Sequence, residues 1–151
     1  MTECPPPASG TIDGKRFLFP LRVYFEDTDV MGIVYYPNYL KWFERARWEM
    51  LRAVGVDLKG SQEAGQGGYA VAAVDIRYHR SAKLDDSIVV ESRVSEIRAG
   101  SVLVAQTALR DGEPIASANL HVVFIGPDGR PRRQPREWIA AFEPFLSKDP
   151  A

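Results

Sequence analysis

Hydrophobic and polar positions alternate near the start of the chain, over residues 17–25. The odd-numbered positions all carry apolar side chains and the even-numbered ones are mixed, a period of two that is typical of a β-strand. Pro20 lies within this run, where it is tolerated near a sheet edge or at the start of a strand. The stretch therefore predicts the first strand of a sheet.

The spacing changes to that of a helix between Pro37 and Gly55. Apolar residues recur there every three or four positions: Leu40, Phe43, Ala46, Met50, Leu51 and Val54. Proline suits a first helical turn, because its missing N–H has no helical partner there, and glycine suits a helix end. Since Tyr39, Trp42 and Trp48 widen the apolar face, we expect this helix to be well buried.

Four more strand-like runs follow, over residues 69–79, 87–97, 101–110 and 114–125. A Gly-rich loop at residues 60–68 precedes them. Asp111-Gly112 predicts a hairpin turn, Asp128-Gly129 a second turn, and Pro135 the start of a short final helix.

This order of elements predicts a single α+β domain over residues 16–147. The economical packing is a five-stranded antiparallel sheet curved around the long helix. One sheet cannot cover all of a helix with so wide an apolar face, so we expect a homodimer or a homotetramer.

Composition and charge restrict the partners and the location that we expect for this domain. The chain has 151 residues and a net charge of -1, so no global field attracts it to nucleic acid or to a membrane. Residues 1–15 are rich in Pro, Gly and small residues and predict a flexible tail, in which Cys4 is an incidental thiol. No run approaches the roughly 20 apolar residues of a membrane span. Glu3 and the prolines after it do not resemble a signal peptide, which favours a cytoplasmic location.

Several familiar sites are absent from the sequence. It contains no G-x-S-x-G or H-E-x-x-H motif. The segment that starts at Asp27 matches a calcium loop at positions one, three and six, but Met31 at position five and Asn38 at position twelve exclude it. His79 and His121 are far apart in predicted strands, where a place on the strand face is the simpler interpretation.

Asp29 is the most promising catalytic side chain. It lies a few residues before the N-terminus of the long helix, which offers unpaired N–H groups and the positive end of a dipole. A carboxylate beside such an anion-stabilising end suits attack on a carbonyl or a thioester. Aspartates that only shape a turn explain Asp27 and Asp29 equally well.

Three blocks of this region resemble the 4-hydroxybenzoyl-CoA thioesterase family of hot-dog-fold enzymes, which includes the Tol-Pal-associated acyl-CoA thioesterases. The blocks are Asp27-Thr28-Asp29, Gly32-Ile33-Val34-Tyr35-Tyr36-Pro37-Asn38-Tyr39 and Glu44-Arg45-Ala46-Arg47. The resemblance implies a hot-dog fold, Asp29 as the catalytic carboxylate and Asp27 as its structural neighbour. It also implies that the backbone N–H of Tyr36 polarises the thioester carbonyl, without a metal or redox cofactor.

The resemblance also suggests how the substrate binds. Arg98 and Arg133 fall where the hydroxybenzoyl branch binds the phosphates of coenzyme A, although Gly100 replaces a lysine of that branch. Glu44 falls where an acidic residue can meet a phenol hydroxyl, but a pair with Arg47 within the helix explains it as well. Two interpretations also fit Trp42 and Trp48: they line an aryl pocket, or they pack in the core.

The expected activity is hydrolysis of an acyl- or aryl-CoA thioester, with 4-hydroxybenzoyl-CoA as the first choice and a short or medium acyl chain next. Two alternatives remain at this point. One is an enoyl-thioester hydratase, which needs His79 or His121 beside a carboxylate. The other is a non-catalytic acyl-CoA-binding module.

Overall fold

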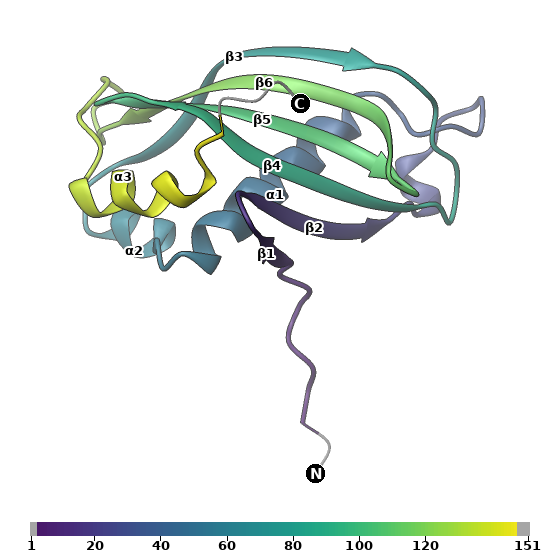
Figure 1. Ribbon diagram of the computed structural model, residues 1–151, viewed down its shortest axis with the longest axis horizontal. Coiled ribbons are helices and arrows are strands. Elements are labelled where there is room, and N and C mark those ends of the chain that lie inside the picture. Colours follow the sequence, from purple (N-terminus) through teal and green to yellow (C-terminus); the bar gives the residue numbers. More distant parts are fainter. Residues whose placement is uncertain (1–2, 148–151) are drawn as a thin grey trace.

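The computed structural model describes residues 3–147, which form one antiparallel sheet with a long helix against it (Figure 1). The elements follow in the order β1 (Thr11–Asp13), β2 (Arg16–Arg22), η1 (Phe25–Asp27), α1 (Asn38–Ala53), α2 (Leu58–Glu63), β3 (Gly68–Tyr78), β4 (Ser87–Ile97), β5 (Ser101–Arg110), β6 (Glu113–Ile125), α3 (Arg136–Phe142) and η2 (Glu143–Phe145). The α+β class and the long central helix agree with the sequence prediction.

The sheet has the order β1-β2-β4-β5-β6-β3, with every neighbouring pair antiparallel. Its inner face carries the large side chains that pack on α1, including Val90 and Val94 of β4 and Leu120 and Phe124 of β6. Because β3 pairs only with β6 within the described residues, its other edge leaves ladder N–H and C=O groups without a strand partner.

Helix α1 occupies the concave side of the sheet, as its apolar pattern predicts. Trp42, Phe43, Ala46 and Met50 are each at most 2% exposed. The chain leaves the helix at Gly55, whose φ of 85° lies in the left-handed region that glycine adopts at little cost. The predicted end of the helix is therefore confirmed.

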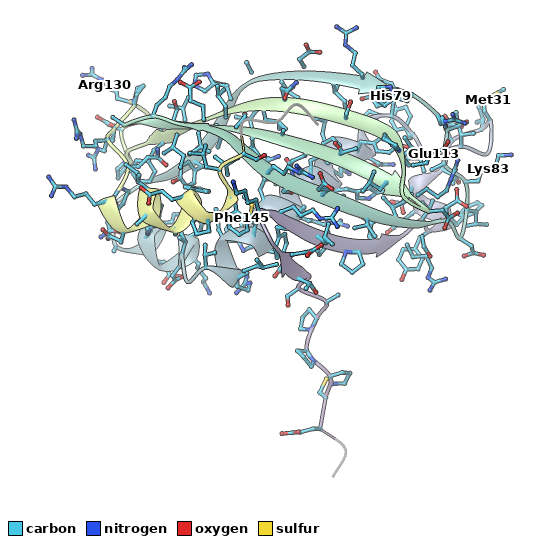
Figure 2. All side chains as sticks on the ribbon, in the orientation of Figure 1. Met31, His79, Lys83, Glu113, Arg130 and Phe145 are labelled. Carbon is cyan, nitrogen blue, oxygen red and sulfur yellow. The ribbon has the colours of Figure 1, made fainter. Side chains whose placement is uncertain are left out.

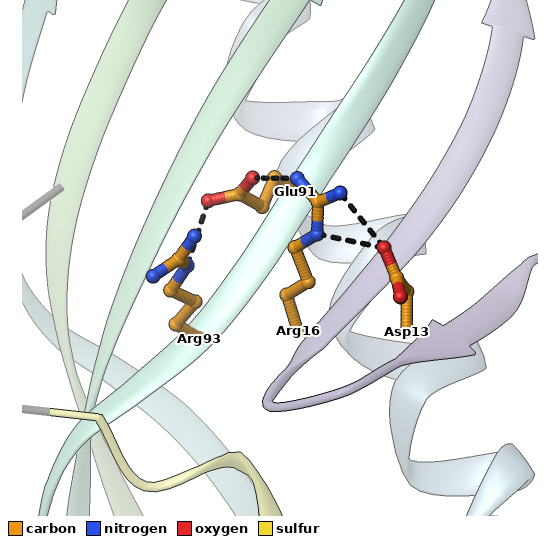
Figure 3. A network of polar contacts seen from close by, with 4 residues as sticks. All are labelled: Asp13, Arg16, Glu91 and Arg93. Atoms are coloured by element: carbon orange, nitrogen blue, oxygen red, sulfur yellow. Dashed lines mark hydrogen bonds and ion pairs between the residues drawn. The ribbon is translucent and has the colours of Figure 1, made fainter.

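The predicted number of five strands is wrong, because β1 adds a sixth. This strand lies inside the segment 1–15 for which the sequence predicts a flexible tail, and it pairs with β2 across a turn at Gly14. Its three residues are all exposed, so it has no alternating burial that a sequence pattern could reveal. Polar contacts hold this edge instead: Arg16 joins Asp13 to Glu91 of β4, and Glu91 also pairs with Arg93 (Figure 3).

Two other local predictions need correction. The short helix α2 starts at Leu58 and runs into the predicted loop at residues 60–68. Asp57 caps this helix by accepting the N–H of Gly60 at 2.9 Å. A helix of six residues with a central glycine has little intrinsic propensity, so the sequence gives no clear signal. The first long strand ends at Arg22, earlier than the alternation suggests, and leaves Phe25 82% exposed in a 3₁₀ turn.

Within residues 3–147, no helix is both long enough and apolar enough to cross a membrane.

Candidate active site

The segment between β2 and α1 folds back on itself as a hydrogen-bonded loop. Thr28 bridges Val34 in an antiparallel sense, and the N–H of Asp29 donates to the carbonyl of Ile33 at 2.9 Å. The Asp27 carbonyl accepts both the N–H of Tyr35 and the side-chain amide of Asn38. These contacts fix the direction in which the chain enters α1.

Asp27 and Asp29 have different surroundings. The Asp27 carboxylate accepts the N–H of Tyr24 at 2.8 Å and so closes the 3₁₀ turn, which fits the structural role implied for it. The Asp29 carboxylate is half-buried and accepts one bond through Oδ1, from the N–H of Met31 at 2.8 Å. Its Oδ2 has no hydrogen bond from residues 3–147, so this oxygen is available for chemistry.

The same loop ends in an unpaired donor just before α1. The N–H of Tyr36 has no hydrogen-bond acceptor among residues 3–147, and Pro37 after it has no N–H to offer. The hydroxyl of Tyr78, at the end of β3, donates to the Tyr36 carbonyl at 3.2 Å. Burial and the neighbouring Tyr36 raise the pKa of Tyr78, so its hydroxyl stays protonated at neutral pH. Tyr78 therefore holds the backbone just after the unpaired N–H.

The turn before β4 is hydrogen-bonded to the same loop. The N–H of Val34 donates to Ala82, and Asp86 accepts both the N–H of Lys83 and the guanidinium of Arg110. The bond from Lys83 and the contact with Arg110 lower the pKa of Asp86. A charged carboxylate thus ties this turn to the end of β5.

A cavity of about 600 Å³ lies farther along α1, between the helix, α2 and the sheet. Its walls are mainly apolar side chains, among them Leu51 and Leu58 from the helices and Val102, Val104 and Val122 from the sheet. Glu44, Arg47 and Trp48 line it from α1, and the β3 segment from Gly68 to Val71 closes it toward the free sheet edge. Its size fits a small-molecule pocket. We call it the inner pocket.

The structure does not pair Glu44 with Arg47, the interpretation that competes with substrate binding. No ion pair links them within residues 3–147, and Glu44 is exposed on the pocket wall. The guanidinium of Arg47 instead donates to Oε1 of Gln106 at 2.9 Å. The amide of Gln106, only 1% exposed, donates in turn to the Phe43 carbonyl and to Ser92.

The two predicted phosphate-binding arginines come together at one end of the molecule. Gln134 follows Arg133 and donates to the carbonyls of Ala99 and Arg98, which places the two segments side by side. The guanidinium of Arg98 already binds Glu96 through two contacts, of 3.0 and 3.1 Å, so a phosphate must compete with that carboxylate. Arg133 is exposed.

The two arginines and the Asp29 loop lie at opposite ends of the sheet. Figure 2 shows Met31 at one end of the sheet and Arg130 at the other. Strand β3 has 11 residues, which corresponds to roughly 35 Å between its ends. One copy of the chain therefore does not gather all the predicted site residues at one place.

His79 directly follows Tyr78, at the same end of the sheet as Met31 (Figure 2), and His121 lies on the outer face of β6. His79 contacts the hydroxyl of Ser117 at 2.8 Å and lines a second hollow, of about 970 Å³. His121 pairs in register with Leu103 of β5, and its Nε2 is buried without a hydrogen bond. Neither histidine has a carboxylate hydrogen-bond partner within residues 3–147, and no three potential ligand side chains there group closely enough to hold a metal.

Sequence reasoning missed two residues of this region. Tyr78 carries no motif, and its contact with Tyr36 spans 42 positions. Gln106 sits in an otherwise apolar strand, and a polar residue at an inward position of such a strand was the available signal.

Comparisons with known proteins agree on the family. Residues 23–143 match the family model described as the thioesterase-like superfamily. The "Acyl-CoA thioesterase YbgC" of Haemophilus influenzae is 39% identical over 127 residues, which cover 83% of this chain and 93% of that protein.

Two solved structures share the architecture. A probable thioesterase from Bartonella henselae superposes with a TM-score of 0.74 at 31% identity, over 78% of this chain and 98% of that one. A 4-hydroxybenzoyl-CoA thioesterase mutant, complexed with 4-hydroxybenzoyl-CoA, superposes with a TM-score of 0.78 at 24% identity, over 85% and 99%; this likeness shows the fold alone. The family model and the Haemophilus relative confirm the resemblance read from the sequence: the chain belongs to the thioesterase-like superfamily, with a hot-dog fold.

Proposed function

We propose that this protein hydrolyses acyl-CoA thioesters to a free acid and coenzyme A. The observation that carries the proposal is the half-buried Asp29 carboxylate with one free oxygen, in the loop that leads to the unpaired N–H of Tyr36. The curated relative is named for the same chemistry.

The two groups have complementary tasks in this proposal. The N–H of Tyr36 donates to the thioester oxygen and stabilises the negative charge that develops on it. Asp29 either attacks the carbonyl carbon, which gives a mixed anhydride that water then opens, or removes a proton from an attacking water. In both routes the C–S bond breaks and the sulfur leaves as a thiolate, a good leaving group that needs no strong acid.

The surface between α1 and β3 favours a homodimer. Five of the large exposed apolar side chains lie along these two elements, and a sixth, Tyr36, lies just before α1. We call the six together the α1–β3 strip: Tyr36, Leu40, Trp48, Val71, Val74 and Tyr78. The free edge of β3 runs beside them. A second copy in antiparallel orientation would pair this edge and cover this strip, as the apolar breadth of α1 requires.

A two-fold axis across this strip also completes the active site. It exchanges the two ends of the strip, so the Asp29 loop of one copy faces the inner pocket of its partner. The Arg98 and Arg133 end of the partner then lies beside the same loop, within reach of the nucleotide of coenzyme A. Guanidinium groups suit this task, because their planar fork matches phosphate oxygens.

An aryl thioester such as 4-hydroxybenzoyl-CoA is our first choice of substrate, and a short or medium acyl-CoA is the second. Glu44 and Trp48 on the pocket wall support an aryl group with a polar substituent.

The test follows thiol release from the purified protein with benzoyl-, 4-hydroxybenzoyl-, hexanoyl- and decanoyl-CoA, while absorbance monitors an enoyl-CoA in parallel. Thiol release supports the hydrolase. Loss of enoyl absorbance without thiol release would identify a hydratase. Tight binding measured by calorimetry, without turnover of any compound, would identify a binding module.

A further inference from the structure

Arg47 is a half-buried cation on the wall of the inner pocket, and its charge is only partly matched. Arg47 lines the apolar cavity, and its one side-chain hydrogen bond within residues 3–147 goes to the neutral amide of Gln106. No carboxylate of the described residues lies within ion-pair distance of it. Desolvation lowers the pKa of Arg47, and Glu44 offsets this only in part.

A guanidinium in such a place favours an acceptor that the chain does not supply. It carries five N–H donors, and burial of a charged donor without partners is costly. Gln106 fixes its position, because the same amide is tied to the Phe43 carbonyl and to Ser92. The guanidinium is thus held in place among the aliphatic walls and retains donors for a ligand.

A purely structural role is the competing explanation. In that case the bond to Gln106 would serve only to join α1 to β5. Such a role accounts for the bond but not for the position of Arg47 on the wall of a 600 Å³ cavity. The two explanations differ in one measurable respect, which is whether Arg47 distinguishes between substrates.

We propose that Arg47 selects acyl or aryl groups that carry an oxygen acceptor at the end remote from the thioester, either a carboxylate or a hydroxyl. The proposal rests on the thioesterase function proposed above, with the acyl group inserted into the inner pocket. The aliphatic walls bind the middle of the group, and Arg47 donates to its terminal oxygen.

The experiment compares substrates that differ only at that end. The pairs are hexanoyl-CoA with the monothioester of adipic acid, and benzoyl-CoA with 4-hydroxybenzoyl-CoA. We expect kcat/KM to be about ten- to a hundredfold higher for the oxygen-bearing member of at least one pair, the size of a hydrogen bond to a charged group. The adipyl and hydroxybenzoyl arms distinguish a carboxylate from a hydroxyl. Equal or reversed preference in both pairs would overturn the proposal.

Variants separate recognition from support of the fold. Arg47→Met keeps the length of the side chain and should abolish the preference, because kcat/KM should fall more for the oxygen-bearing member of a pair than for the other member. Arg45→Met, an exposed neighbour on α1, is the matched control and should leave the preference intact. A uniform loss for all substrates, together with a lower melting temperature, would show that Arg47 only supports the helix.

A failure of the thioesterase function itself would look different. In that event no substrate releases thiol, and calorimetry of the same four compounds then tests Arg47 through binding. The oxygen-bearing members should still bind more tightly to the wild type than to Arg47→Met. Equal affinities for both proteins would overturn the proposal in that case as well.

Discussion

The two ends of the α1–β3 strip differ in how they are built. At the Asp29 end, short-range backbone bonds hold a loop that presents one carboxylate and one unpaired N–H. At the other end, side chains distant in sequence enclose the inner pocket, next to a segment rich in arginine. The first end is suited to reaction and the second to recognition. They lie far apart in one chain, with Met31 at one end of the sheet and Arg130 at the other (Figure 2), and the homodimer proposed above would bring them together.

The largest effect should come from Asp29→Asn. The amide can still accept the N–H of Met31, so the loop should keep its shape while the nucleophile or base is lost. We expect kcat to fall by about 10²- to 10⁴-fold, measured by thiol release.

Asp27→Asn is the matched control for this change. The hydrogen bond of the Asp27 carboxylate goes to the backbone N–H of Tyr24, so its substitution should affect the melting temperature more than kcat. Full activity in Asp29→Asn would remove Asp29 from the mechanism.

Mixing two inactive variants tests the separation of the two ends directly. Gly68→Trp should fill the inner pocket without disturbing the backbone, because a Cβ at Gly68 meets no atom within 4 Å. Co-expressed with Asp29→Asn, it should restore about a quarter of wild-type activity: half of the dimers are mixed, and each of these has one intact site.

Gly68→Ala is the control and should remain active alone. If the mixture stays as inactive as its components although tagged copies co-purify, the site lies within a single chain. The comparison between the two ends would then lose its functional meaning.

The same contrast explains how much the sequence could predict. The Asp29 loop could be predicted from the sequence, because the residues that define it are close together: Asp27, Asp29 and Pro37 lie within 11 positions. The inner pocket could not be predicted, because Arg47 and Gln106 meet only after α1 packs on β5. Such contacts depend on the curvature of the sheet, which a pattern of hydrophobic positions does not specify.

Strands show the same limit. The four long strands β3 to β6 were predicted almost to the residue, because each has a long alternating or continuous apolar run bounded by turns. Strand β1 has no such pattern and could not be predicted, because ion pairs rather than burial hold it (Figure 3).

A smaller effect should follow from Tyr78→Phe, which removes the bond to the Tyr36 carbonyl and keeps the ring contacts with Tyr36 and Tyr39. A less firmly held helix start should lower kcat about two- to tenfold and change KM little, as for the loss of one neutral hydrogen bond.

Tyr35→Phe serves as the comparison, because the Tyr35 hydroxyl makes no hydrogen bond within residues 3–147. If both variants retain full kcat, the Tyr78 hydroxyl does not position the Tyr36 backbone.

The smallest effect concerns the turn beneath the Asp29 loop. Asp86 has its folded-state pKa lowered by Lys83 and Arg110, so its charged form stabilises the fold. This contribution is complete above the unfolded-state pKa of about 3.9, and it is lost as the pH falls through the lower folded-state pKa. Because Asp86 is partly exposed, solvent screening should limit the contribution to less than about 1 kcal/mol. Asp86→Asn should therefore melt slightly below the wild type at pH 7, and the two melting temperatures should converge toward pH 3. A constant difference between pH 7 and pH 3 would mean that the ionised carboxylate is not what ties this turn to β5.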